Sequence, residues 1–166
     1  MLDALRIRPA TPADRADLRR AIMELQDYER HLHDSRLAGE LVADRYLDWM
    51  QRRSESDGII LVAESDGAFA GFVAGWVEHA ANAGETAEAN RFGLISDVCV
   101  MPAYRGRRLA TRLLGAIEHY LRRAGVVRLR IAALAANRSA RQSYQHAGFV
   151  PYEIIHEKLI GTGKDG

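Results

Sequence analysis

The stretch YRGRRLATRLL, residues 104–114, places an Arg-Gly turn directly before an amphipathic helix. The first N–H groups of a helix lack partners within the helix and lie at the positive end of its dipole. Small residues near the turn, here Gly106 and Ala110, let an anion approach these groups. The stretch therefore predicts a backbone cradle for a phosphate or pyrophosphate. The plainer alternative is an ordinary strand-to-helix connection that binds nothing.

Arg108 occupies the position where such a cradle would most favour a second glycine. Glycine gives access to positive φ and adds no side chain beside a ligand. An arginine is tolerated if its φ is negative, and its charge then favours a phosphate by up to ~1 kcal/mol. We expect a negative φ at Arg108, with the side chains of Arg107 and Arg108 near phosphates or in solvent.

A second stretch, NRSARQSYQHAGF at residues 137–149, also stands out. Taken singly, its residues have plain structural explanations. Asn137 is suited to an N-cap, and Tyr144 to an amphipathic core position four residues after Ala140. The joint pattern Asn-x-x-Ala-x-x-x-Tyr-x-x-x-Gly-Phe, downstream of the arginine turn, is harder to explain by structure alone.

Hydrophobic periodicity and turn residues predict the elements around these stretches. Strands are expected over residues 5–9, 59–64, 69–79, 92–100, 126–134 and 149–160. Helices are expected from Thr11 and Pro12 onward, over 37–53, from about Leu109 to a stop at Gly125, and over 138–147. The order βααβββαβαβ predicts an α+β fold in one domain, residues 1–160, followed by a polar tail at 161–166. Residues 80–91 are expected to form a surface loop.

The composition argues against several classes of partner. With 23 basic and 22 acidic side chains in 166 residues, a net charge of +1 argues against a nucleic-acid partner. Cys99 is the only cysteine, which favours a reducing compartment without an internal disulfide. No apolar run has the length of a membrane span or a signal peptide, so we expect no membrane partner and a cytoplasmic location.

Together the two stretches resemble the motifs of the GCN5-related N-acetyltransferases, the GNAT superfamily, whose members transfer an acyl group from coenzyme A to an amine. The main family motif, Arg/Gln-x-x-Gly-x-Gly/Ala, falls on Arg105, Arg108 and Ala110, with Arg108 replacing a glycine. The second motif is matched by Asn137, Ala140, Tyr144, Gly148 and Phe149. The element order also matches the family fold, a mixed twisted sheet flanked by helices and splayed between its fourth and fifth strands. Residues 1–90 match in element order alone.

The resemblance implies acetyl-CoA as cosubstrate. The main chain of 98–100 would pair with the pantetheine arm, N–H groups of 106–111 would hold the pyrophosphate, and Asn137 would hydrogen-bond the cofactor. Tyr144 would protonate the leaving thiolate, since a phenol with a pKa near 10 roughly matches an alkyl thiolate. The implied cofactor-binding residues are Val98, Cys99, Val100, Arg105, Gly106, Arg107, Arg108, Leu109, Ala110, Thr111, Asn137, Ala140 and Tyr144.

On the acceptor side, the amine must lose a proton and the developing oxyanion needs N–H donors, here those of Val98 or Cys99. Asp97 is the preferred proton acceptor; its structural alternative is a capping or salt-bridging role where the strands diverge. Weaker acceptor-site candidates are Glu24, Tyr28, Glu78 and His79, although the first helix presents a charge-rich face that solvent alone could explain. We expect no metal site, because His31 and His33 cannot share a helix face.

The residues and the resemblance together predict an acetyltransferase acting on a primary amine of a small molecule, by direct attack in a ternary complex. An acetyl-Cys99 intermediate is disfavoured, since a buried apolar role suits Cys99 better. Two alternatives stay open: acetylation of a protein N-terminus or lysine, and a non-catalytic acyl-CoA-binding module. The loop at 80–91 is expected to separate small from protein acceptors by closing or leaving open the site. The fold also admits a homodimer.

Overall fold

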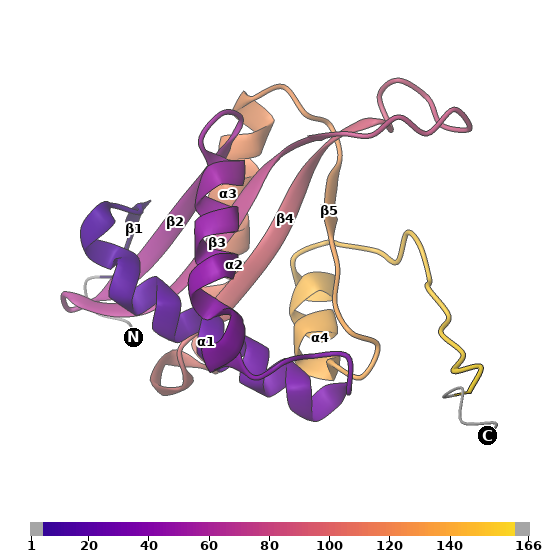
Figure 1. Ribbon diagram of the computed structural model, residues 1–166. Coiled ribbons are helices and arrows are strands. Elements are labelled where there is room, and N and C mark those ends of the chain that lie inside the picture. The colour runs from indigo at the N-terminus through magenta and orange to yellow at the C-terminus, as the bar shows by residue number, and fades with distance from the viewer. Residues whose placement is uncertain (1–4, 162–166) are drawn as a thin grey trace.

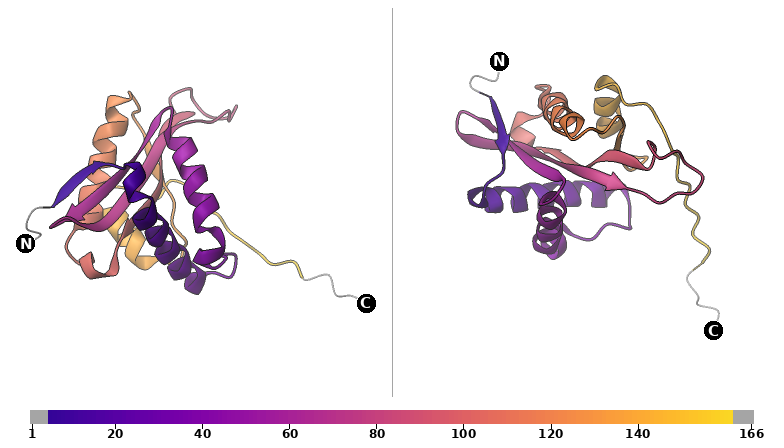
Figure 2. Two further views of the ribbon diagram at one scale, coloured as in Figure 1. Left: turned by 60° about the vertical axis from the view of Figure 1, so that its left-hand side comes forward. Right: turned by 90° about the horizontal axis from the view of Figure 1, so that it is seen from above.

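The computed structural model describes residues 5–161, in which one mixed sheet is covered by helices on both faces (Figures 1 and 2). The sheet has five strands in the order β1-β2-β3-β4-β5. Neighbours are antiparallel except β4 and β5, which are parallel. The strands are β1 (Arg6–Pro9), β2 (Gly58–Ser65), β3 (Ala68–His79), β4 (Arg91–Val100) and β5 (Leu129–Ile131). The predicted α+β fold is thereby confirmed.

The helices divide between the two faces of the sheet, as the view from above shows (Figure 2). One pair covers one face and the other pair covers the opposite face: α1 (Arg15–Leu32) with α2 (Gly39–Ser54), and α3 (Leu109–Arg123) with α4 (Arg138–His146). Among the described residues no helix is long and apolar enough to cross a membrane.

Alternation along the strands creates two cores, because successive side chains point to opposite faces. Phe72, Ala74 and Trp76 of β3 pack on the α1 and α2 side, where they meet buried residues of those helices such as Leu18 and Met50. The core on the α3 side contains strand residues Val73, Val77 and Ile95 and helix residues Leu113, Leu114, Ile117 and Leu121.

The hairpin between β2 and β3 follows directly from its sequence. Asp66 and Gly67 form the turn with φ of 52° and 78°. Two positive φ values in a two-residue connection match the type I′ turn, whose twist suits antiparallel strands. The turn predicted from Ser-Asp-Gly-Ala is confirmed.

A bulge and a divergence in β4 shape the centre of the sheet. Gly75 pairs with Ile95 and Ala74 with Asp97, so Ser96 is an extra residue in β4. On the other side, β5 pairs with β4 only over Gly93–Ile95, and the two strands then spread apart (Figure 1). The segment 96–100 therefore has a free edge toward β5, which confirms the predicted splay.

The last predicted strand is wrong for this chain. After α4, the segment 149–160 contains no strand, and the sheet ends at β5. Its apolar pattern supplies a strand-like face, but a strand also needs a neighbour for its backbone hydrogen bonds, and Pro151 lacks an N–H. The predicted strand over 126–134 shortens to β5. Of the predicted tail at 161–166, only Gly161 lies within the described residues.

Candidate active site

The arginine turn joins the end of β4 to α3, as the sequence predicts. A short 3-10 turn at Pro102–Tyr104 follows β4, and α3 begins at Leu109. Its first intrahelical hydrogen bond runs from the N–H of Arg112 to the carbonyl of Arg108, at 3.2 Å. The N–H groups of 109–111 thus precede the helical ladder and are free to bind a ligand. A Cβ added at Gly106, where φ is 75°, would meet no atom within 4 Å, so the turn opens onto free space.

The expectation of a negative φ at Arg108 is wrong. Arg108 has φ 58° and ψ 20°, in the left-handed region, as the N-cap of α3. This conformation costs a residue with a side chain about 1–2 kcal/mol. The backbone therefore keeps a conformation suited to glycine while the sequence supplies arginine. Strain of this kind clusters at binding sites, where the surrounding structure holds it in place.

Arg105 is tied to two other elements. Its Nε donates to the carbonyl of Val100 at 3.1 Å, and its Nη2 contacts Oε1 of Glu24 at 3.0 Å. The guanidinium therefore links the turn to the end of β4 and to α1 by hydrogen bonds. Its side chain serves the geometry of the turn, which leaves ligand binding to the backbone and to the exposed side chains of Arg107 and Arg108.

The second motif forms α4 and its caps. The Oδ1 of buried Asn137 accepts from the N–H of Ala140 at 3.1 Å, so the N-cap prediction is confirmed. Tyr144 packs against Phe149, with ring centroids 6.2 Å apart, in the core on the α3 side. No hydrogen bond to the Tyr144 hydroxyl forms within the described residues, which leaves this hydroxyl available to a ligand.

Burial raises the pKa of Tyr144 above its ordinary value of 10, and the carboxylates of Glu29 and Asp97 add to the effect. The hydroxyl therefore stays protonated across the neutral range, as a proton donor must. Its proton is also held more tightly than the ordinary phenol pKa suggests.

Asp97 is buried with two hydroxyl partners. Its carboxylate accepts from Oγ of Ser96 at 2.7 Å and from the hydroxyl of Tyr46 at 3.0 and 3.1 Å. Burial raises the pKa of Asp97, and the two hydrogen bonds oppose that rise only in part. A carboxylate with a raised pKa accepts protons more readily near neutral pH, which suits a base.

Two charged residues of α1 and the following loop belong to the same region. The carboxylate of Glu29 lies 3.0 Å from Nε of Arg36. The negative charge of Glu29 further raises the pKa of Asp97, whereas the positive charge of Arg36 lowers the pKa of Asp97. Sequence reasoning missed this pair and also Tyr46, which lies within the helix predicted over 37–53. Single polar residues on helices give no signal of their spatial partner, and Tyr46 lies 51 positions from Asp97.

The weaker acceptor candidates are not all brought together. Glu24 is paired with Arg105, and Tyr28, one turn further along α1, is 39% exposed. Glu78 contacts Arg53 at 2.6 Å and accepts from Nε1 of Trp76 at 3.1 Å. Since Ala74 pairs with Asp97, Glu78 lies four residues, roughly 13 Å, away along β3. Glu78 and His79 are therefore at the other end of the sheet.

Cys99 is buried, as expected from its neighbours. Its side chain is on the α1 and α2 side, and its Sγ lies 3.5 Å from the carbonyl of Ala21. Burial raises the pKa of the thiol to about 12. A thiol that remains protonated is a poor nucleophile, so the geometry disfavours an acetyl-cysteine route.

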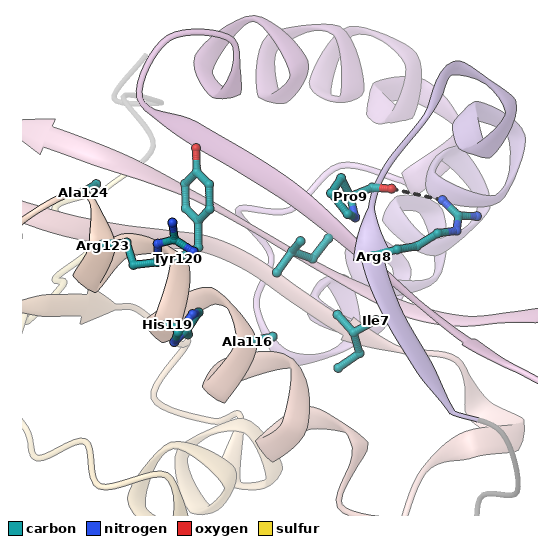
Figure 3. Close-up of a pocket in the computed structure, with 9 residues that line it drawn as sticks. Ile7, Arg8, Pro9, Ala116, His119, Tyr120, Arg123 and Ala124 are labelled. Atoms are coloured by element: carbon teal, nitrogen blue, oxygen red, sulfur yellow. Dashed lines mark hydrogen bonds between the residues drawn. The ribbon is translucent and has the colours of Figure 1, made fainter.

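A separate hollow of about 720 Å³ lies between β1 and α3 (Figure 3). Ile7, Arg8 and Pro9 form one side, and His119, Tyr120 and Arg123 the other. It contains none of the predicted site residues. Its Arg8 is already engaged by Asp14 and Glu64.

The fold and the turn define a class of protein with a mixed, splayed sheet and an open turn between its fourth strand and the helix that follows. The chain belongs to the acetyltransferase (GNAT) family, whose model matches residues 20–149. No curated protein sequence matches the chain with significance.

Solved structures share the fold at low identity. A GCN5-related N-acetyltransferase from Ralstonia eutropha JMP134 is 18% identical, with a TM-score of 0.75 over 95% of this chain and 100% of that one. The aminoglycoside 6′-N-acetyltransferase AAC(6′)-IG from Acinetobacter haemolyticus is 20% identical, with a TM-score of 0.68 over 95% and 99%. AAC(6′)-Iy, solved with the bisubstrate analogue CoA-S-monomethyl-acetylneamine, is 17% identical, with a TM-score of 0.68 over 96% and 100%.

Proposed function

We propose that the protein is an acetyl-CoA-dependent N-acetyltransferase that acts on a primary amine of a small molecule. The observation that carries this proposal is the free edge of β4 over 96–100, which leads directly to the open turn at Gly106. An extended pantetheine arm can hydrogen-bond along that edge, and the N–H groups of 109–111 can receive the pyrophosphate. The residues present therefore fit the cosubstrate.

Proton transfers in this proposal use Asp97 and Tyr144, two groups whose pKa values are raised. The amine nitrogen attacks the acetyl carbonyl carbon, and the carbon–sulfur bond breaks. Asp97, directly or through water, takes the proton that the amine loses, and Tyr144 gives its proton to the departing thiolate. The N–H group of Val98 or that of Cys99, next to the Ser96 bulge, is the candidate donor to the oxyanion.

The choice of a small amine is supported by charge and by the kind of relatives that share the fold. Glu29 and Asp97 both add negative charge to the region between α1, α2 and β4, and Arg36 pairs with Glu29 but not with Asp97, so the region favours a cationic acceptor. Two of the structurally similar proteins, AAC(6′)-Iy and AAC(6′)-IG, are named aminoglycoside acetyltransferases. The loop at 80–91 joins the Arg91 end of β4, whereas the turn follows the Val100 end (Figure 1), and its role in separating small from protein acceptors stays a prediction.

The first test concerns the cosubstrate. Gly106→Val forces a branched side chain into a conformation with φ 75° and into the space open to a ligand. We expect at least a tenfold weaker Kd for coenzyme A, measured by isothermal titration calorimetry. Gly115→Val on α3, where a Cβ meets open space at ordinary helical φ, is the matched control. An unchanged Kd for Gly106→Val would contradict the cradle.

The second test concerns transfer. Tyr144→Phe keeps the packing against Phe149 and removes the hydroxyl, so coenzyme A binding should persist while turnover falls roughly 10²-fold. Acetylation of a panel of amines, polyamines, amino acids and peptides, followed by mass spectrometry, supplies the acceptor for this measurement. Unchanged turnover would remove Tyr144 from the mechanism. Acetylation of peptides alone would favour the protein acceptor, and coenzyme A binding without any transfer would favour a binding module.

A further inference from the structure

Tyr46 connects helix α2 to the buried carboxylate of Asp97 on β4. Its hydroxyl lies 3.1 Å from Oδ1 and 3.0 Å from Oδ2 of Asp97, so one donor bridges both oxygens. A second donor, Oγ of Ser96, contacts Oδ2 at 2.7 Å. Ser96 is the chain neighbour of Asp97, whereas Tyr46 is 51 positions away. The Tyr46 contact therefore depends on how α2 packs against the sheet.

Aromatic packing holds the ring of Tyr46 in place. Its centroid is 5.2 Å from that of Trp49, and Trp49 meets the buried ring of Trp76 edge-on at 5.3 Å. The indole Nε1 of Trp76 in turn donates to Glu78 at 3.1 Å. A side chain whose rotamer is fixed by packing presents its polar atom in a constant direction. The hydroxyl of Tyr46 is thus preorganised to meet the carboxylate of Asp97.

Tyr46 remains a hydrogen-bond donor across the neutral range of pH. Burial raises the pKa of Tyr46 above its ordinary value near 10, and the negative charge of Asp97 adds to the rise. The phenol is therefore no base itself, but it stabilises the ionised form of Asp97, because a donor favours a carboxylate over the neutral acid. Burial raises the pKa of Asp97, and the hydrogen bonds from Ser96 and Tyr46 offset part of this rise.

The two oxygens of Asp97 differ in the acceptor capacity that they retain. Oδ2 accepts from both Ser96 and Tyr46, whereas within residues 5–161 Oδ1 accepts only from Tyr46. An ionised carboxylate has about four lone-pair sites. Oδ1 therefore keeps the greater capacity to accept a proton from an amine or from a water molecule.

We propose that Tyr46 is a positioning residue for Asp97: its hydroxyl fixes the orientation of the carboxylate and favours the ionised form, which leaves Oδ1 to take the proton. This inference rests on the proposed function, in which Asp97 is the base. It adds a role for α2, because the packing of this helix sets the proton affinity of the base. A carboxylate that burial alone would keep protonated becomes usable through the tyrosine.

Kinetics as a function of pH test the proposal. Tyr46→Phe removes the hydroxyl and keeps the ring packing on Trp49. Without this donor the pKa of Asp97 rises further, so the acid limb of the kcat/KM profile should move up by about one pH unit, a roughly tenfold loss on that limb. At higher pH the activity should recover, because the carboxylate is ionised again. The Kd for coenzyme A should not change.

Tyr120→Phe is the matched control. It removes a tyrosine hydroxyl that donates to the carbonyl of Gly58 at 3.0 Å, on the α3 side of the sheet. The acid limb should stay where the wild-type chain has it. An equal displacement of the limb in Tyr120→Phe and Tyr46→Phe overturns the proposal.

The charge of Glu29 gives a test of opposite sign. The charged and titratable groups that face Asp97 from other positions are Glu29 of α1, Arg36 of the following loop, Cys99 of β4 and Tyr144 of α4. Because the negative charge of Glu29 raises the pKa of Asp97, Glu29→Gln should move the acid limb to lower pH. An acid limb that disappears in Glu29→Gln belongs to Glu29 and overturns the proposal.

Carbon-13 NMR of the aspartate carboxyl carbons gives a readout that needs no turnover. The Asp97 signal is identified by its absence in Asp97→Asn, and its titration midpoint should be about one pH unit higher in Tyr46→Phe than in the wild type. An unchanged midpoint overturns the proposal, as does a loss of activity that is equal at every pH. A raised midpoint together with full activity in Asp97→Asn would support the role of Tyr46 and refute the base of the proposed function.

Discussion

Asp14 and Asp97 are both buried carboxylates, 7% and 8% exposed, yet their surroundings are opposite. Asp14, in the turn before α1, receives two 2.8 Å hydrogen bonds from Arg8 and two more from Thr11, of 2.7 Å from its N–H and 2.9 Å from its Oγ1. The Arg8 guanidinium lowers the pKa of Asp14. Asp97 receives hydrogen bonds from two neutral hydroxyls, and burial raises its pKa.

The comparison shows that burial of a carboxylate alone does not indicate its role. A carboxylate paired with a cation stabilises the fold, because the folded state favours its charged form. A carboxylate held only by hydroxyls is costly as a charge and is ready to take up a proton, as acid–base chemistry requires. Asp14 therefore belongs to the framework, whereas the surroundings of Asp97 are compatible with the proposed role as a base.

The largest effect is expected at Asp97. Asp97→Asn keeps the shape and the acceptor oxygen for Tyr46 and Ser96 but removes the base, so turnover should fall about 10²–10⁴-fold. Steady-state kinetics on an acceptor from the amine panel measure this. Asp44→Asn on α2, whose side chain is 58% exposed, is the control. Full activity in Asp97→Asn would assign this residue a purely structural role.

Asp97→Asn should not lower the stability of the protein at neutral pH, although Asp97 is buried and hydrogen-bonded. Because the folded pKa of Asp97 is raised, its contribution to stability is present below the unfolded value near 4 and is lost as pH rises through the folded pKa. Asp97→Asn escapes that loss, so at neutral pH it should be at least as stable as the wild type. Urea unfolding at pH 4 and pH 7 checks this, and a large loss of stability at pH 7 would contradict it.

Asp14→Asn should give the reverse result. Breaking a buried charged hydrogen-bond pair should lower the free energy of unfolding by about 2 kcal/mol and leave turnover unchanged. Because the folded pKa of Asp14 is lowered, its stabilisation is present above about pH 4 and is lost as pH falls toward the folded value. The difference from wild type in urea unfolding should thus shrink with acidification. A difference that grows in acid would be inconsistent with the Arg8 pairing.

At Arg108, as at the two aspartates, a substitution should affect stability and ligand binding differently, but with smaller effects. Arg108→Gly removes a left-handed arginine, so stability should rise by up to about 1 kcal/mol after the entropy cost of glycine. Loss of the charge should weaken coenzyme A binding only a few-fold. Arg107→Gly, at a position without positive φ, should lower stability or leave it unchanged. Equal stability changes in the two variants would argue against strain at Arg108.

The sequence predicted the features that depend on neighbouring residues. Helix α3 begins where Leu109 follows the turn, Asn137 caps α4, and Asp66 with Gly67 turns the hairpin. Each depends on local backbone chemistry that a few consecutive residues determine. The divergence of β4 and β5 was reached through resemblance to a family rather than from local pattern.

The missed features depend on partners distant in sequence. The hydrogen bond from Tyr46 to Asp97 joins α2 to β4, and no spacing rule connects them. The φ of Arg108 is imposed by the path from β4 to α3, whereas the residue type alone favours a negative value. The pattern around Ile154 predicts a strand, but it cannot say which edge, if any, will accept it.

Burial of Cys99 has a practical consequence for all of these experiments. It is the only cysteine in the chain, it is 4% exposed, and the pKa of its thiol is raised to about 12. The folded protein should therefore react slowly with thiol reagents, so the coenzyme A thiol released at each turnover can be followed colorimetrically above a low background. For the same reason, a cysteine placed at an exposed position would take a fluorescent label selectively.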